Sequence, residues 1–155
     1  MNLEPSNQVN IYGLDKYFNE LKNLYNDNIL PNKILLSGPK GSGKSTLAYH
    51  LINYILSKDE QFSYNCDEYS INTNNKSFRL ILNKTNTNFN LVDINKEKKL
   101  IDISQIRNLI SILNKSSFNN KPRFVLIDNI EFLNVNSINA LLKIIEEPLK
   151  NIFFF

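Results

Sequence analysis

Apolar residues recur with the spacing of a helix in four stretches of this chain, which begin near residues 14, 44, 103 and 135. This spacing predicts four amphipathic helices, each with one face turned toward a core. The residues predicted to face inward are, in chain order, Leu14, Tyr17, Phe18, Leu21, Leu24 and Tyr25; Leu47, Ala48, Leu51, Ile52 and Ile55; Ile103, Ile106, Leu109, Ile110 and Leu113; Val135, Ile138, Leu141, Leu142 and Ile145.

Capping and breaking residues support these helices. Asp102 and Gln105 form a capping box at the start of the third helix, with Asp102 as the N-cap and Gln105 at N3. Asn134 can cap the fourth helix. Pro31 lies just beyond the first helix and Pro148 just beyond the fourth, where proline stops a helix.

Short apolar runs between the helices predict the strands. Residues 33–37, 89–94, 123–128 and 151–155 are such runs, and the first reads as a strand covered on both faces. Residues 78–83 alternate between apolar and polar side chains, which predicts one more strand. Strands that alternate with helices predict an α/β fold with a parallel sheet flanked by helices. Because the chain stops inside a strand, we expect an incomplete sheet and an uncovered apolar tail.

The composition fits one soluble domain of 155 residues, with 42% hydrophobic residues. The single Cys66 excludes a disulfide framework and a cysteine-rich zinc site built from this chain alone. No apolar run approaches the ~20 residues that cross a bilayer, and the start lacks a secretory signal, so we expect a cytoplasmic protein without membrane contact. A net charge of +3 is too small to indicate nucleic acid.

Residues 38–45 match the phosphate-binding motif G-x-x-x-x-G-K-[ST] in full, between a predicted strand and a predicted helix. Lys44 would reach the β- and γ-phosphates, and the Ser45 hydroxyl would ligate Mg²⁺. A glycine-rich turn without a ligand is the alternative. The predicted contacts to ATP or ADP are Gly38, Pro39, Lys40, Gly41, Ser42, Gly43, Lys44, Ser45 and Thr46.

Asp128 ends a predicted buried strand, the position of a Walker B aspartate that holds Mg²⁺ through water; an ordinary strand-end residue that caps a turn is the alternative. ATPases of the AAA+ type carry a glutamate next, which polarises the attacking water. Here that position is Asn129, which cannot accept a proton, and Glu131 is an outside candidate. We therefore assign no catalytic residue. His50 is interpreted as a surface or packing histidine, and Cys66 as a free thiol.

Residues 139–148 read Asn-Ala-Leu-Leu-Lys-Ile-Ile-Glu-Glu-Pro, which resembles a segment of bacterial clamp-loader AAA+ subunits, the delta prime and gamma/tau subunits of DNA polymerase III. Residues 102–110 and 30–39 also resemble this family, and the resemblance is weak through 58–90. Gamma/tau subunits typically carry a four-cysteine zinc module and a glutamate after the Walker B aspartate. This chain has Cys66 alone and Asn129, so it resembles delta prime, although some delta prime proteins have lost the complete P-loop that is present here.

The resemblance implies a P-loop NTPase fold of the AAA+ type in which residues 1–155 form a nucleotide-binding domain, truncated before the sensor and lid region. It implies an ATP-binding subunit with little or no hydrolysis of its own that helps to load the sliding clamp on primed DNA. The implied partners are the gamma/tau and delta subunits, the sliding clamp and primer–template DNA. The alternatives are a gamma/tau-type ATPase motor and a small P-loop kinase, and the kinase gives no reason for residues 139–148.

Overall fold

The computed structural model describes residues 4–95, 99–117, 119–146 and 150–155. The predicted helix stop at Pro148 lies outside the described residues. Within the described part, no helix is both long enough and apolar enough to cross a membrane. The chain divides into two compact units: Met1–Pro31 with Leu35–Asn86, and Asn32–Ile34 with Thr87–Phe155.

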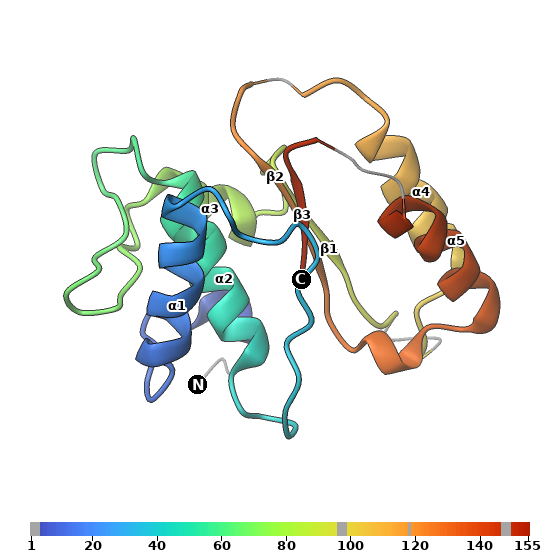
Figure 1. The fold of residues 1–155 in the computed structure, drawn as a ribbon, viewed down its shortest axis with the longest axis horizontal. Coiled ribbons are helices and arrows are strands. Elements are labelled where there is room, and N and C mark those ends of the chain that lie inside the picture. Colours follow the sequence, from blue (N-terminus) through green and yellow to red (C-terminus); the bar gives the residue numbers. More distant parts are fainter. Residues whose placement is uncertain (1–3, 96–98, 118, 147–149) are drawn as a thin grey trace. The chain divides into compact units, whose positions relative to one another are not determined.

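A parallel sheet forms the centre of the second unit (Figure 1). Its strands are β1 (Phe89–Val92), β2 (Arg123–Ile127) and β3 (Ile152–Phe154), in the order β1-β2-β3. Val92 pairs with Ile127 and Phe124 with Phe153. These strands confirm the predictions for residues 89–94, 123–128 and 151–155, and together with their flanking helices they confirm the α/β fold class.

Two helices cover one face of this sheet: α4 (Ile103–Leu113) follows β1, and α5 (Val135–Glu146) follows β2 (Figure 1). Two crossovers of the same hand place their helices on the same face when the strand order advances in one direction. The core between sheet and helices contains Val92, Ile101, Ile106, Leu109, Leu113, Val125, Leu141, Ile144, Ile152 and Phe154.

Polar contacts fix both ends of α4. The predicted capping box is confirmed, because Asp102 accepts from the Gln105 amide (3.3 Å) and the Gln105 side chain accepts from the Asp102 amide (3.0 Å). At the other end the guanidinium of Arg123 donates to the carbonyls of Leu113 (2.9 Å) and Lys115 (3.0 Å). A cation that binds the last carbonyls of a helix satisfies acceptors that have no partner within the helix.

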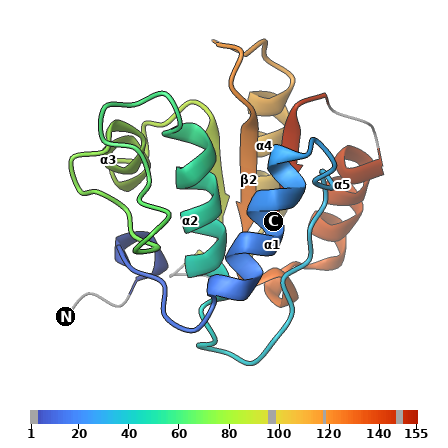
Figure 2. The same cartoon turned by 60° about the vertical axis from the view of Figure 1, so that its left-hand side comes forward.

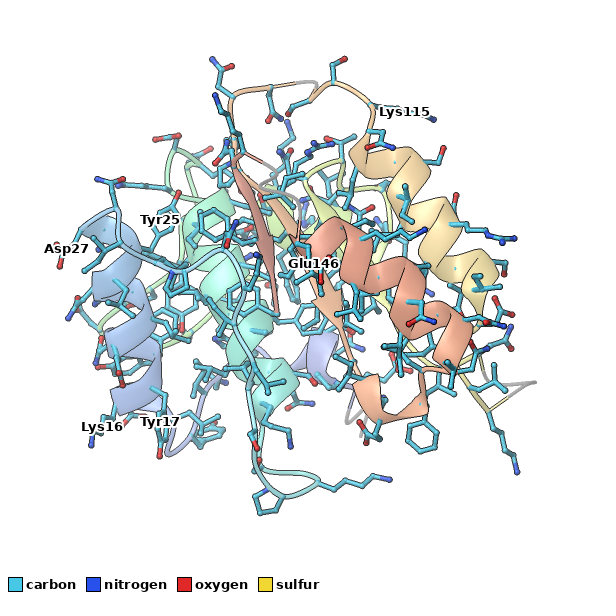
Figure 3. All side chains as sticks on the ribbon, turned by 45° about the vertical axis from the view of Figure 1, so that its right-hand side comes forward. Lys16, Tyr17, Tyr25, Asp27, Lys115 and Glu146 are labelled. Carbon is cyan, nitrogen blue, oxygen red and sulfur yellow. The ribbon has the colours of Figure 1, made fainter. Side chains whose placement is uncertain are left out.

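The first unit contains the short helix η1 (Pro5–Asn7) and the helices α1 (Asp15–Asn26), α2 (Lys44–Leu56) and α3 (Lys76–Leu82) (Figure 2). Phe18 of α1 is fully buried within the first unit. Its ring stacks on Tyr64 at 5.0 Å and meets Tyr54 and Tyr69 edge-on at 6.0 and 5.8 Å. All five predicted core residues of α2 are buried, whereas Tyr17, at the N-terminal end of α1 (Figure 3), is exposed against prediction.

Residues 78–83 are not a strand, and the prediction there was wrong. Residues 76–82 form α3, which begins where the Asn75 side chain accepts from the Phe78 amide (2.8 Å). The Glu60 carboxylate accepts from the amide and hydroxyl of Ser77 (3.1 and 2.6 Å) and stabilises the same helix start. Phe78 and Ile81, three residues apart, are the buried apolar pair. Their helical spacing prevails over the apparent alternation.

The strand predicted at residues 33–37 is also wrong, because only a single bridge forms, between Lys33 and Phe154. The Phe154 amide donates to the Asn32 carbonyl, and the Ile34 amide donates to the Phe154 carbonyl, both at 2.9 Å. Leu35 is 78% exposed, so this segment is not covered on both faces. A strand extends only as far as neighbouring backbone groups face it, and this pairing reaches no further than Ile34.

The face that α5 buries differs from the predicted one. Leu141 is buried, Ile145 is half-buried, and the predicted Val135 is 72% exposed, with Ile138 and Leu142 also exposed. The cause is Ser137, which is fully buried and donates its hydroxyl to the Ile101 carbonyl at 3.2 Å. This bond turns the line through Ser137, Leu141 and Ile144 inward and the other apolar line outward.

The expectation of an uncovered apolar tail at the end of the chain was also wrong. Ile152, Phe154 and Phe155 are buried, and the Phe153 ring stacks on Phe124 at 5.5 Å. Ile152 and Phe154 belong to the core between the sheet and its helices, and the Phe155 ring lies 6.3 Å from the Phe124 ring.

His50 of α2 is fully buried and makes a hydrogen bond through each ring nitrogen. Nδ1 lies 2.9 Å from the Tyr64 hydroxyl, and Nε2 lies 2.9 Å from the Gln8 carbonyl. Because a carbonyl can only accept, Nε2 carries the proton and the Tyr64 hydroxyl donates to Nδ1. Burial lowers the pKa of His50 to about 4, against a smaller raising effect of the Gln8 carbonyl. His50 is therefore a packing residue, one of the two roles expected.

We expect the free energy of unfolding to fall as the pH drops from 6.5 toward 4, because the unfolded chain binds a proton that the folded His50 excludes. The slope should reach about 1.4 kcal/mol per pH unit. His50 is the single histidine of the sequence. Urea unfolding of the wild type and of His50→Gln across this window isolates its contribution, since the carboxylates act equally in both. Equal slopes would contradict the expectation, and NMR titration of the imidazole gives the pKa directly.

Candidate nucleotide-binding site

The P-loop motif lies in the first unit and leads directly into α2, whose first residue is Lys44. Gly41 and Gly43 have φ angles of +80° and +82°, a left-handed conformation that glycine adopts without strain. Gly43 is the N-cap of α2, and no side chain caps this helix end. The loop therefore places backbone amides and the positive end of the helix dipole together, the arrangement that attracts phosphate.

The interior of the loop is kept open by glycine and lined by lysine. A Cβ atom at Gly38 would lie 3.3 Å from the Ser42 hydroxyl and 3.9 Å from Cδ of Lys44, so a side chain there would fill the loop. The Lys44 ammonium donates to the carbonyls of Gly38 (2.8 Å) and Pro39 (2.7 Å). Residues 38–42 are exposed, and Gly43, Lys44, Ser45 and Thr46 are half-buried. The residues present fit a phosphate group.

The second part of the predicted site lies in the other unit, at the carboxyl end of β2. Asp128 follows this strand, and its amide donates to the Val92 carbonyl at 2.9 Å. Asn129 is left-handed (φ 58°, ψ 46°), and its amide donates to Oδ1 of Asp128 at 3.0 Å. The short helix η2 (Ile130–Phe132) follows, and its Glu131 is exposed. Asp128, Asn129 and Glu131 thus occupy one tight turn.

Asp93, which follows β1, contacts this turn and was missed by the sequence analysis. Its Oδ1 accepts from the side-chain amide of Asn129 at 2.8 Å. The pattern of residues 89–94 placed Asp93 inside a strand, whereas β1 ends at Val92. One feature of the sequence could have revealed Asp93: an acid follows each of the two apolar runs that form β1 and β2. Val92 pairs with Ile127, so these two acids follow paired residues. Neighbouring parallel strands that both end in an acid place the two acids side by side.

The chemistry of each part differs. The P-loop carries cationic and amide donors suited to an anion, and the β2 end carries carboxylate oxygens suited to a hard cation such as Mg²⁺. Among the described residues no three His, Cys, Asp or Glu side chains gather in one place. A Mg²⁺ ion at Asp128 would therefore take most of its ligands from water and phosphate oxygens, as Mg²⁺ usually does. Cys66 is a half-buried free thiol, as predicted.

A parallel sheet flanked by helices, with a complete P-loop motif at a helix start, defines an α/β protein of the P-loop class. The family described as DNA polymerase III, delta subunit matches residues 13–155. Two curated relatives are named DNA polymerase III subunit delta', and the chain belongs to this family of DNA polymerase III subunits.

Two curated relatives give the measure of similarity. The DNA polymerase III subunit delta' of Pseudomonas aeruginosa is 31% identical over 114 residues, which cover 74% of this chain and 33% of the relative. The subunit delta' of Buchnera aphidicola subsp. Baizongia pistaciae is 29% identical over 129 residues, or 79% of this chain and 37% of the relative. The chain thus spans about a third of the length of the curated relatives it matches.

Gly43→Ala should lower the free energy of unfolding more than Gly41→Ala. Both positions are left-handed, which costs alanine about 1–2 kcal/mol. Only at Gly43 would the new Cβ also lie 2.8 Å from another side chain, Cδ1 of Leu14; at Gly41 nothing lies within 4 Å. Urea unfolding measures both losses, and Gly43→Ala should cost less in a Leu14→Ala background. Equal losses at the two glycines would contradict the prediction.

Proposed function

We propose that this chain is the nucleotide-binding part of a delta prime clamp-loader subunit. In this proposal it binds ATP or ADP with Mg²⁺ but hydrolyses ATP negligibly, and it braces the neighbouring subunits that open the sliding clamp. The observation that carries the proposal is the combination of a complete, open P-loop with an amide side chain, Asn129, at the position where AAA+ motors have a carboxylate. Membership of the delta prime family supports it.

Nucleotide binding would use residues 38–46. The backbone amides of the loop and the start of α2 would donate to phosphate oxygens, and the Lys44 ammonium would leave the carbonyls of Gly38 and Pro39 for phosphate. Ser45 and Asp128 are the proposed Mg²⁺ ligands. Exchanging two neutral carbonyls for a charged phosphate favours the bound state, because the Lys44 ammonium then faces a negative charge instead of two neutral dipoles.

Weak hydrolysis follows from the turn after β2. The Asn129 side chain donates to Asp93 and has no proton-accepting nitrogen, so it cannot act as a general base. Glu131 is exposed on η2, two residues further along. A role as a brace that retains nucleotide fits this arrangement better than a role as a motor. Neither Cys66 alone nor Asn129 fits a gamma/tau motor, and the family match gives a kinase no support.

The proposed partners follow from the family. Both curated relatives are named as subunits of DNA polymerase III, which supports a role for this chain within that replication assembly. The proposed partners are the gamma/tau and delta subunits, the sliding clamp and primer–template DNA, and the proposed location is the cytoplasm. The proposal also takes residues 1–155 as an AAA+ nucleotide-binding domain of a longer protein with a lid and a collar.

Lys44→Ala should weaken the binding of Mg²⁺-ADP by at least tenfold, about 1.4 kcal/mol, because it removes the ammonium that would contact phosphate. Titration of a fluorescent ADP analogue against the full-length protein measures the change. Lys58→Ala is the matched control, since Lys58 is an exposed lysine beyond the other end of α2 and outside the loop, and the affinity of this variant should stay within about threefold of the wild type. Equal affinities of wild type and Lys44→Ala would refute nucleotide binding through this loop.

Disabling this subunit's P-loop should leave the ATPase rate of the complete loader unchanged. A missing general base typically costs ~10²–10⁴-fold in rate, so this site would contribute almost nothing to turnover. The steady-state rate is compared for loaders reconstituted with wild-type or Lys44→Ala subunit, with clamp and primed DNA, because a neighbouring subunit can supply an arginine finger. A proportionate loss of turnover that Glu131→Gln reproduces would instead identify Glu131 as the base and the chain as a motor.

A further inference from the structure

Two acidic residues end neighbouring strands in the second unit. Val92 and Ile127 are the last paired residues of β1 and β2, and Asp93 and Asp128 directly follow them. The Asp128 amide donates to the Val92 carbonyl at 2.9 Å, so the pairing continues to this point. Adjacent parallel strands lie about 4.8 Å apart, which brings the two acids close together.

Asn129 donates one hydrogen bond to each of these acids. Its backbone amide donates to Oδ1 of Asp128 at 3.0 Å, and its side-chain amide donates to Oδ1 of Asp93 at 2.8 Å. Its own carbonyl accepts from the Phe132 amide at 3.0 Å, which closes η2. A left-handed backbone is unfavourable for most residues other than glycine, though least so for asparagine, and the bonds to the two acids favour this conformation at Asn129.

Asp93 is itself held on two sides. Its Oδ1 also accepts from the Ile94 amide at 2.7 Å, and its backbone carbonyl accepts from Nε2 of Gln105 at 2.8 Å. Gln105 is the N3 residue of the capping box, and its Oε1 accepts from the Asp102 amide. A chain of hydrogen bonds therefore runs from the start of α4 through Asp93 and Asn129 to the Asp128 carboxylate.

We infer that Asp93 is a positioning residue, which fixes the orientation of the Asp128 carboxylate by holding Asn129 in its left-handed conformation. The inference deepens the proposed function and rests on it where Mg²⁺ is concerned. Asp93 acts through Asn129 and does not need to touch nucleotide or metal. Without Asp93, Asn129 would be free to leave the left-handed region, and its amide would turn away from Asp128.

The first test needs no ligand. In the full-length protein, the Asn129 backbone amide should exchange its hydrogen at least tenfold faster in Asp93→Ala than in the wild type, as followed by ¹⁵N NMR. Asp93→Asn should keep slow exchange, because an amide oxygen still accepts from Asn129. Asn134→Ala is the control, since it removes the α5 cap bond to the Ser137 amide (2.8 Å) in the same unit without touching Asp93.

The second test measures the metal dependence of binding. The ratio of ADP affinities in Mg²⁺ and in EDTA should fall at least threefold in Asp93→Ala and in Asn129→Ala. The double variant should lose no more than either single variant, because both act on one contact. Asp93→Asn and Asn134→Ala should retain the wild-type ratio. If the role of Asp93 were merely structural, Asp93→Ala would leave the ratio of affinities in Mg²⁺ and in EDTA unchanged.

The outcomes distinguish a positioning role of Asp93 from a merely structural one. Unchanged exchange in Asp93→Ala, or equal acceleration in Asn134→Ala, would overturn the positioning role. Faster exchange with an unchanged Mg²⁺ ratio would overturn its connection to metal. If the wild type binds no nucleotide in Mg²⁺, the proposed function fails, and the exchange measurement by itself decides whether Asp93 orients Asp128.

Discussion

The parallel pairing of β2 with both β1 and β3 is the constraint on which the second unit depends. Parallel neighbours cannot be joined by a tight turn, so each connection needs a crossover, and these crossovers are α4 and α5. Arg123 begins β2 and binds the last carbonyls of α4, which fixes that helix to the sheet. Asp128 follows the other end of β2. The same strand thus supports the core and presents the candidate metal ligand.

Buried amide side chains hold the loops of both units in place. Asn53 of α2 donates to Asn75 at 3.1 Å, and Asn75 donates to the Phe62 carbonyl at 2.8 Å, which ties the segment between α2 and α3 to the helix beneath it. In the other unit Asn88 donates to Asn119 at 2.9 Å. In this chain, asparagine amides and the His50–Tyr64 contact hold the loop after α2.

The candidate site separates two requirements that a motor combines. Phosphate recognition needs glycine conformations, a helix start and a lysine, and the loop before α2 has all of them. Hydrolysis needs a proton acceptor near the attacking water, and the turn after β2 has an amide that is already bonded to Asp93. Under the proposed function, a subunit of this kind would hold nucleotide without turning it over.

The sequence by itself determined the features whose causes are local. The capping box at Asp102, the five core positions of α2 and the P-loop each depend on residues a few positions apart, so their patterns could be interpreted without the fold. Tertiary structure decided the rest. The Glu60 carboxylate supports α3 where alternation suggested a strand, and Ser137 turns α5 by bonding to Ile101. Asp93 meets Asn129 only because β1 pairs with β2, since contacts between residues 36 positions apart depend on strand register and leave no local pattern.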